Sequence, residues 1–204
     1  MNEKFFSLPE EKQRAILNAG YRVFSRNSYK KSPVSEIADA AGISKSLLFH
    51  YFRNKKELYL YLWDTAARTT LEYLAAYQTY EQPDVFATMR RGLQAKTAIM
   101  RRWPDMGAFT IKAYYEKDPE VYTEIQESIR LYGSFETNGA AMQLDPADYR
   151  PGLDLEMMYQ DMFWASEGYV WENLRKEVID VDRMEADFGR MIDFWEQIYG
   201  RNEG

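Results

Sequence analysis

The segment Pro33–Lys55, PVSEIADAAGISKSLLFHYFRNK, constrains the fold of this chain more than any other. Ser32 is placed to cap a first short helix that begins at the proline, where a missing N–H costs nothing, and apolar residues recur at helical spacing over 34–41. Gly42 can adopt a positive φ in the following turn, and Ser44 can cap a second helix. Two helices joined by a short turn containing Gly form a helix-turn-helix, whose second helix fits a DNA major groove.

The second helix of this motif has an apolar side and a polar side. Leu48, Tyr51 and Phe52 are predicted to face inward. The remaining positions face wholly or partly outward, and they are Lys45, Ser46, Leu47, Phe49 and His50. This arrangement predicts that the outward side chains meet the DNA.

The run from Gly42 to Leu58, GISKSLLFHYFRNKKEL, resembles the signature of the TetR family of transcriptional repressors. The matching features are the Ala-Gly turn, Ser44-Lys45, Leu48, the His50-Tyr51-Phe52 triplet, Lys55 and Leu58. The rest of the chain resembles the family only in length and helical character. The resemblance implies a repressor that binds duplex DNA as a homodimer and is released by a small, mostly apolar molecule. The alternative is a constitutive DNA-binding regulator with no small-molecule effector.

DNA binding requires anchors on the phosphates and readers of the base edges. Lys55 is expected to be an anchor, because it opens a helix whose N-terminus already favours an anion and because the family's matching lysine contacts phosphate. Base reading is expected from Ser35, Lys45, Ser46 and Leu47. The full predicted DNA-binding set is Ser35, Ser44, Lys45, Ser46, Leu47, Phe49, His50, Tyr51 and Lys55.

Four of these positions depart from the family pattern or have a second interpretation. Leu47 stands where the family often has Thr, and it can pack against a thymine methyl or belong to the core. Phe49 replaces the usual Tyr and lacks its hydroxyl, while Ser46 replaces a common Gly. Tyr51 can be a core tyrosine, can contact the DNA backbone through its hydroxyl, or can do both. The operator sequence therefore does not follow from any relative.

The charge distribution supports binding of DNA through one end of the chain. The formal net charge is −6, but residues 1–60 carry +5 and residues 61–204 carry −11. A basic head on an acidic body can bind phosphates with the head alone. We therefore predict a helix-turn-helix DNA-binding domain over 1–54 and an effector-binding and dimerisation domain over 55–204.

The whole chain is predicted to be all-α, with a three-helix amino-terminal bundle and a larger helical carboxy-terminal domain. A continuous helix is expected over 55–80, and two further long helices over 154–176 and 182–199. The first of these two is apolar on more than one face, which indicates burial against both its own core and a partner subunit. The predicted dimer interface consists of Met158, Met162, Trp164, Trp171, Phe188, Met191 and Trp195.

The aromatic content of 16% suits a large core, a cavity or a subunit interface. The family resemblance implies a cavity, and the candidate lining residues are Trp63, Trp103, Phe109, Tyr114, Tyr132 and Trp164. Plain core packing is the competing interpretation for each of them. The acidity of the body is compatible with a cationic ligand or with a merely solvated surface.

Several classes of function lack the residues that they need. The chain has no cysteine and one histidine, so neither thiolate chemistry nor a histidine metal site is expected. It has no Gly-rich phosphate loop and no nucleophile elbow, so we expect no enzyme and no cofactor. No apolar run approaches the roughly 18 residues of a membrane span, and the expected location is the cytoplasm.

Overall fold

The computed structural model describes residues 3–132, 144–174, 176 and 179–201. Within these ranges the regular elements are helices, and an isolated antiparallel bridge joins Tyr149 to Gly200. The all-α prediction is therefore confirmed. The chain divides into two compact units, which we call unit 1 (1–69 and 103–132) and unit 2 (70–102 and 133–204). The predicted functional boundary after residue 54 stays a prediction, because compactness alone does not assign roles.

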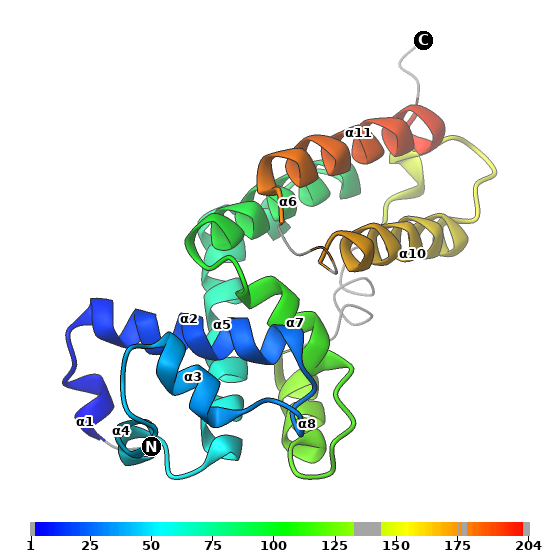
Figure 1. Cartoon of the computed structure of the whole chain (residues 1–204). Helices are drawn as coiled ribbons and strands as arrows, with labels where there is room; N and C mark the ends of the chain where they lie inside the picture. Colours follow the sequence, from blue (N-terminus) through cyan, green and yellow to red (C-terminus); the bar gives the residue numbers. More distant parts are fainter. Residues whose placement is uncertain (1–2, 133–143, 175, 177–178, 202–204) are drawn as a thin grey trace. The chain divides into compact units, whose positions relative to one another are not determined.

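Unit 1 contains the helix-turn-helix and the helices that support it (Figure 1). Its helices are α1 (Glu3–Phe6), α2 (Glu10–Arg26), α3 (Val34–Ala40), α4 (Lys45–Tyr51), the first part of α5 (Lys55–Ala76), α7 (Met106–Tyr114) and α8 (Tyr122–Tyr132). α2 packs along α7 as well as against α3, so residues distant in sequence share one core.

Aromatic rings fill the centre of unit 1. The Phe109 ring lies 5.3 Å from that of Tyr21 and 5.2 Å from that of Tyr59, between ring centroids. Phe24 meets Tyr59 edge-on at 4.8 Å. Such tilted and edge-on pairs add to the free energy gained from burying each ring, by about 0.5–1.5 kcal/mol per pair. The core therefore joins α2, α5 and α7 firmly.

A glycine allows α2 and α5 to approach each other closely. A Cβ atom at Gly20 would lie 2.6 Å from the Leu62 Cδ1 atom, which is closer than carbon atoms can pack. Leu62 is itself fully buried. The absence of a side chain at Gly20 thus lets the Leu62 methyl groups fill the space against α2.

The structure moves two helix boundaries that the sequence predicted. α3 begins at Val34 with Pro33 at the N-cap, and the Ser32 hydroxyl donates to the Ser28 carbonyl oxygen at 2.9 Å instead of capping the helix. The helix predicted over 55–80 ends at Ala76, because Gln78 adopts a left-handed conformation with φ 51° that a helix cannot continue.

Unit 2 contains the end of α5, the short 3-10 helices η1 (Thr79–Glu81) and η2 (Pro146–Asp148), and the helices α6 (Val85–Arg102), α10 (Leu155–Leu174) and α11 (Val181–Tyr199). Its core is formed by apolar side chains of α6, α10 and α11 together with Tyr149. α6 and α11 lie side by side over much of their length (Figure 1).

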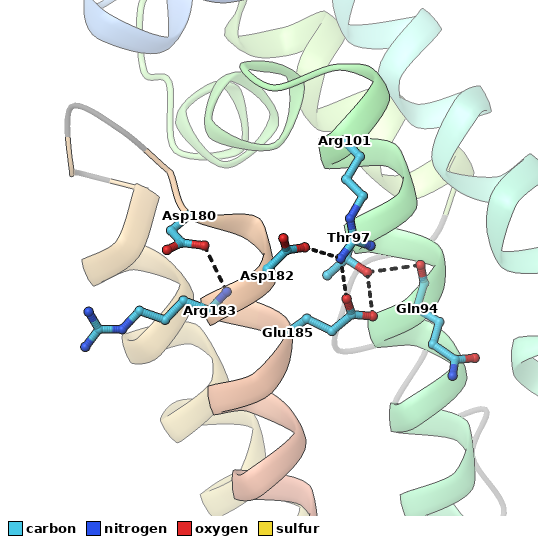
Figure 2. A network of polar contacts seen from close by, with 7 residues as sticks. All are labelled: Gln94, Thr97, Arg101, Asp180, Asp182, Arg183 and Glu185. Carbon is cyan, nitrogen blue, oxygen red and sulfur yellow. Dashed lines mark hydrogen bonds and ion pairs between the residues drawn. The ribbon is translucent and has the colours of Figure 1, made fainter.

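Two arginines of α6 bind carboxylates of α11 in the same manner. Arg101 donates to Asp182 and Glu185 at 2.6 and 2.5 Å. Arg90 donates to Asp193 and Glu196 at 2.7 and 2.6 Å. Figure 2 shows the Arg101 fork, in which the Thr97 hydroxyl also lies 3.1 Å from the Glu185 carboxylate. These forks join α6 to α11 at two positions along the length of the helices.

Candidate nucleic-acid interface

The recognition helix α4 has a buried face and an exposed face, as the sequence predicted. Leu48, Tyr51 and the following Phe52 are buried. The Ser44 hydroxyl accepts the Leu47 N–H at 3.1 Å, which confirms Ser44 as the N-cap. The turn before it contains Gly42 with φ +68°, a conformation that suits glycine. The helix therefore starts at a fixed point and presents a defined set of side chains.

Three of the four predicted base readers are exposed, Ser35 on α3 and Lys45 and Ser46 on α4. His50, which was predicted to contact DNA but not to read bases, is also exposed on α4. Leu47 is half-buried, a position compatible with both of its interpretations. The Lys45 ammonium and the hydroxyls of Ser35 and Ser46 are therefore accessible to base edges, while the roles themselves stay predictions.

Phe49 has a partner within α4. Its ring is 38% exposed, and the Lys45 ammonium lies 5.9 Å from the ring centroid. A cation over an aromatic face is attracted by about 0.5–1 kcal/mol at an exposed site. Phe49 thus restricts the directions that the Lys45 side chain can take.

Lys55 has more protein partners than a simple phosphate anchor requires. Its ammonium lies 3.2 Å from the Lys30 carbonyl oxygen and 3.5 Å from that of Ser32, and 4.6 Å from the centroid of the Tyr29 ring. An ammonium has three N–H donors, so one remains for a phosphate oxygen. Lys55 therefore holds the α2–α3 turn in place, and its predicted contact with DNA stays a prediction.

Tyr51 is largely buried, with 8% of its surface exposed. Its ring packs edge-on against Phe5 of α1 at a centroid distance of 6.1 Å. This burial supports the core interpretation and leaves only a small part of the side chain accessible from outside.

The connection between α7 and α8 also holds the α2–α3 turn, which sequence reasoning did not predict. The Tyr29 N–H donates to the Glu116 carboxylate at 2.7 Å, and the Lys112 ammonium donates to the Ser25 carbonyl oxygen at 3.4 Å. Lys56 pairs with Glu124, and this ion pair holds the pKa of Glu124 below its usual value. No local sequence signal could have found contacts between residues so far apart in the chain.

The predicted effector-site residues are distributed over both units. Phe109 is fully buried in the aromatic core, and the Trp63 indole N–H donates to the Ser128 hydroxyl at 2.7 Å. Trp103 lies edge-on to Tyr21 at 6.1 Å. Tyr114 and Trp103 are half-buried, whereas Trp164 is exposed in unit 2. The side chain of Tyr132 lies outside the described residues.

The predicted dimer residues separate into a core group and a surface group. Met158, Met162 and Trp195 lie in the core of unit 2, and the half-buried Phe188 and Met191 pack against that core. Trp164 and Trp171 are 60% and 45% exposed. The difference arises because α10 has two apolar stripes on different faces. Met158 and Met162 belong to the stripe that faces the core, and Trp164 and Trp171 belong to the exposed one.

Further large apolar side chains that the prediction omitted are exposed on α10 and α11. Met157 precedes Trp164 and Trp171 at seven-residue intervals, and it is 57% exposed. Phe194 and Ile198 of α11 are exposed as well. The spacing of Met157 was visible in the sequence, but nothing in the sequence told which stripe faces the core.

The helix-turn-helix region is similar to a known protein family. Residues 16–62 match the family model described as "Bacterial regulatory proteins, tetR family". This region of the chain is a TetR-family helix-turn-helix domain. The matched region extends from α2 to the middle of α5, and so contains both helices of the motif.

Curated transcriptional regulators match part of this chain. It is 26% identical over 81 residues to the HTH-type transcriptional regulator AcrR of Shigella flexneri, a match that covers 40% of this chain and 38% of AcrR. It is 40% identical over 60 residues to the HTH-type transcriptional activator FasR of Mycolicibacterium smegmatis, covering 29% of this chain and 27% of FasR. The chain thus spans well under half of the curated relatives it matches.

Solved structures extend the likeness in fold to nearly the whole chain. The structure of a TetR family transcriptional regulator from Chloroflexus aurantiacus superposes with a TM-score of 0.62 at 21% identity, over 98% of this chain and 99% of that one. At this identity the likeness concerns the fold alone. None of the helices in the described ranges combines the length and hydropathy of a membrane-crossing segment.

Proposed function

We propose that this protein is a transcriptional repressor that binds a palindromic operator as a homodimer. The observation that carries the proposal is the exposed face of α4, where Lys45, Ser46 and His50 are exposed on a helix whose other face is buried. Ser35 and Leu47 complete the base-reading surface, and Lys55 and the partly accessible Tyr51 approach the sugar-phosphate backbone. We infer a cytoplasmic protein without catalytic activity.

The homodimer is supported by the exposed stripe of unit 2. Met157, Trp164 and Trp171 of α10 present a row of large exposed apolar side chains at seven-residue intervals, and Phe194 of α11 is exposed as well. A row of exposed apolar side chains of this kind marks an interaction site in soluble proteins. Paired copies of two helices form a four-helix interface. Two heads related by a twofold axis then read half-sites about 34–36 Å apart.

Release by a small, mostly apolar molecule is the second part of the proposal. It rests on the family resemblance and on the half-buried Trp103 and Tyr114 of unit 1. A ligand that binds one conformation more tightly lowers the affinity for DNA by the ratio of its affinities for the two states.

A constitutive regulator without an effector is the competing function, and one observation favours it. Phe109 has no exposed surface and packs against three rings of the aromatic core, and the Trp63 N–H already has a partner in Ser128. Two of the predicted pocket residues thus serve the core of unit 1. The sign of regulation also needs measurement, because FasR is an activator by name.

Selection of bound fragments from a genomic library, followed by a ligand screen, tests the proposal. Recovery of palindromic fragments that bind two protomers would support it, and a compound that releases them would favour the ligand-responsive form. If no duplex is retained even at low salt, the proposal is wrong. If duplexes are retained and no compound in a broad apolar library releases them, the constitutive form replaces it.

A further inference from the structure

The short helix α1 buries one side chain completely beneath the recognition helix. Phe5 has no exposed surface, although α1 has only four residues. The centroid of its ring lies 5.0 Å from that of Phe52, 6.1 Å from that of Tyr51 and 5.7 Å from that of Tyr61. Phe5 thus contacts Tyr51, the last residue of α4, as well as Phe52 and the α5 residue Tyr61.

Hydrogen bonds join α1 and the turn that follows it to α2. The Gln13 side-chain amide donates to the Leu8 carbonyl oxygen at 2.8 Å and to that of Phe6 at 3.2 Å. The Leu8 N–H donates back to the Phe5 carbonyl oxygen at 3.2 Å. These bonds close the turn between α1 and α2, so the position of the Phe5 ring is coupled to the long helix α2.

The recognition helix needs such support because it is short. α4 has seven residues, about two turns, and a helix of that length is not stable without tertiary packing. α3 packs on it from one side, and α1 packs on it from another. Removal of the Phe5 ring would leave a void under Tyr51 and Phe52, and the end of α4 would move into it.

We propose that Phe5 is a positioning residue for DNA recognition, which sets the orientation of α4 and thereby the placement of its base-reading side chains. The inference rests on the proposed DNA binding. It concerns a residue outside the region 16–62 that matches the family model. Phe5 itself touches no DNA, so its effect is on the fit of α4 and not on the number of phosphate contacts.

The test compares Phe5→Ala with two other changes in the full-length protein. Phe6→Ala removes the same ring from the neighbouring position, where 54% of the side chain is exposed, and is the matched control. Phe5→Leu keeps most of the buried volume and is the conservative variant. Affinities are measured for a duplex selected by the wild-type protein and for the same duplex with one base pair of the half-site changed, each over a range of salt concentrations.

We expect Phe5→Ala to lower the affinity for the selected duplex by about tenfold, the loss that one misplaced base contact produces. The preference over the changed duplex should fall, and the salt slope should stay as in the wild type, because the phosphate contacts are kept. Phe6→Ala should match the wild type, and Phe5→Leu should recover most of the loss. A reduced melting temperature alone would not produce this pattern.

Each outcome decides the inference. If folded Phe5→Ala binds both duplexes as the wild type does, Phe5 only stabilises unit 1 and the inference is wrong. If Phe5→Ala does not fold, Gln13→Ala, which releases the α1–α2 turn without opening the core, decides by the same two readouts. If the wild type itself selects no duplex, the proposed function fails and not this inference alone.

Discussion

The backbone N–H of Tyr29 donates a hydrogen bond of 2.7 Å to the side chain of Glu116, a residue 87 positions further along the chain. The same carboxylate accepts the N–H groups of Lys117 and Asp118 at 3.0 Å each. One side chain thus satisfies three backbone donors and joins the α7–α8 connection to the α2–α3 turn. The helix-turn-helix is therefore supported by residues far outside its own sequence.

Replacement of Glu116 by Ala should destabilise unit 1, because three backbone donors lose their acceptor. We expect a loss of about 1–3 kcal/mol in the free energy of unfolding, measured by urea denaturation. Glu116→Gln keeps one acceptor oxygen and should lose less. Glu127→Ala, a change at an exposed glutamate of α8, should have little effect. Equal stability of Glu116→Ala and the wild type would show that water replaces the carboxylate without cost.

Lys55→Ala should weaken binding to all duplexes to a similar degree. If Lys55 contacts a phosphate in each protomer, the magnitude of the salt slope should fall by about 0.9 per contact. Lys45→Ala is the comparison, since loss of a base reader should reduce the preference for the selected sequence more than the slope. An unchanged slope for Lys55→Ala would assign this lysine to the α2–α3 turn alone.

Trp164→Asp should dissociate the proposed homodimer. Burial of a large aromatic side chain contributes about 2–3 kcal/mol, so the change should raise the dissociation constant by at least roughly a hundredfold when both protomers carry it. Sedimentation velocity measures the result. Leu131→Asp, a change at an exposed apolar residue of α8, is the control. A dimer that persists in Trp164→Asp would place the interface elsewhere.

The raised pKa of Tyr149 predicts a loss of folding stability at alkaline pH. Burial, the largest cause, and the nearby Asp148 and Asp84 raise the pKa of Tyr149 from 10.0 to about 12. A group whose pKa is raised by folding contributes stability that is complete below its unfolded pKa and is lost as the pH rises towards the folded value. Between pH 10 and 12 the wild type should therefore lose more stability than Tyr149→Phe, by about 1 kcal/mol once solvent screening of the phenolate is allowed for.

Urea denaturation at pH 8 and at pH 11.5 in both proteins isolates this contribution. Tyr122→Phe, a change at an exposed tyrosine of α8, should follow the wild type at both values. Should Tyr149→Phe lose as much stability as the wild type over this range, the Tyr149 phenol is hydrated in the folded protein.

Local signals in the sequence predicted the recognition motif well. Ser44 caps α4 as the sequence indicated, because capping depends on residues three or four positions apart. Ser32 failed as a cap because the helix begins at Val34, one residue later than predicted, so that Pro33 and not Ser32 stands at the N-cap. Local patterns do not fix the start of a helix to a single residue.

Features that depend on tertiary contacts were not predictable. The two apolar stripes of α10 are similar in composition, so the sequence could not tell that Met158 and Met162 enter the core while Trp164 stays exposed. Phe5 and Glu116 act on residues that are distant in the chain, and neither belongs to a recognisable motif. The predicted pocket residues share this difficulty, because core and cavity use the same aromatic side chains.

The two arginine forks between α6 and α11 have a consequence for how this helix pair can slide. Eleven positions separate Arg90 from Arg101, and eleven separate Asp182 and Glu185 from Asp193 and Glu196. A shift of α11 by one turn would change the acids that face both arginines at once, because the two acid pairs have the same spacing as the two arginines. The forks therefore favour one register of α6 and α11, and any motion of α11 is expected to move α6 with it.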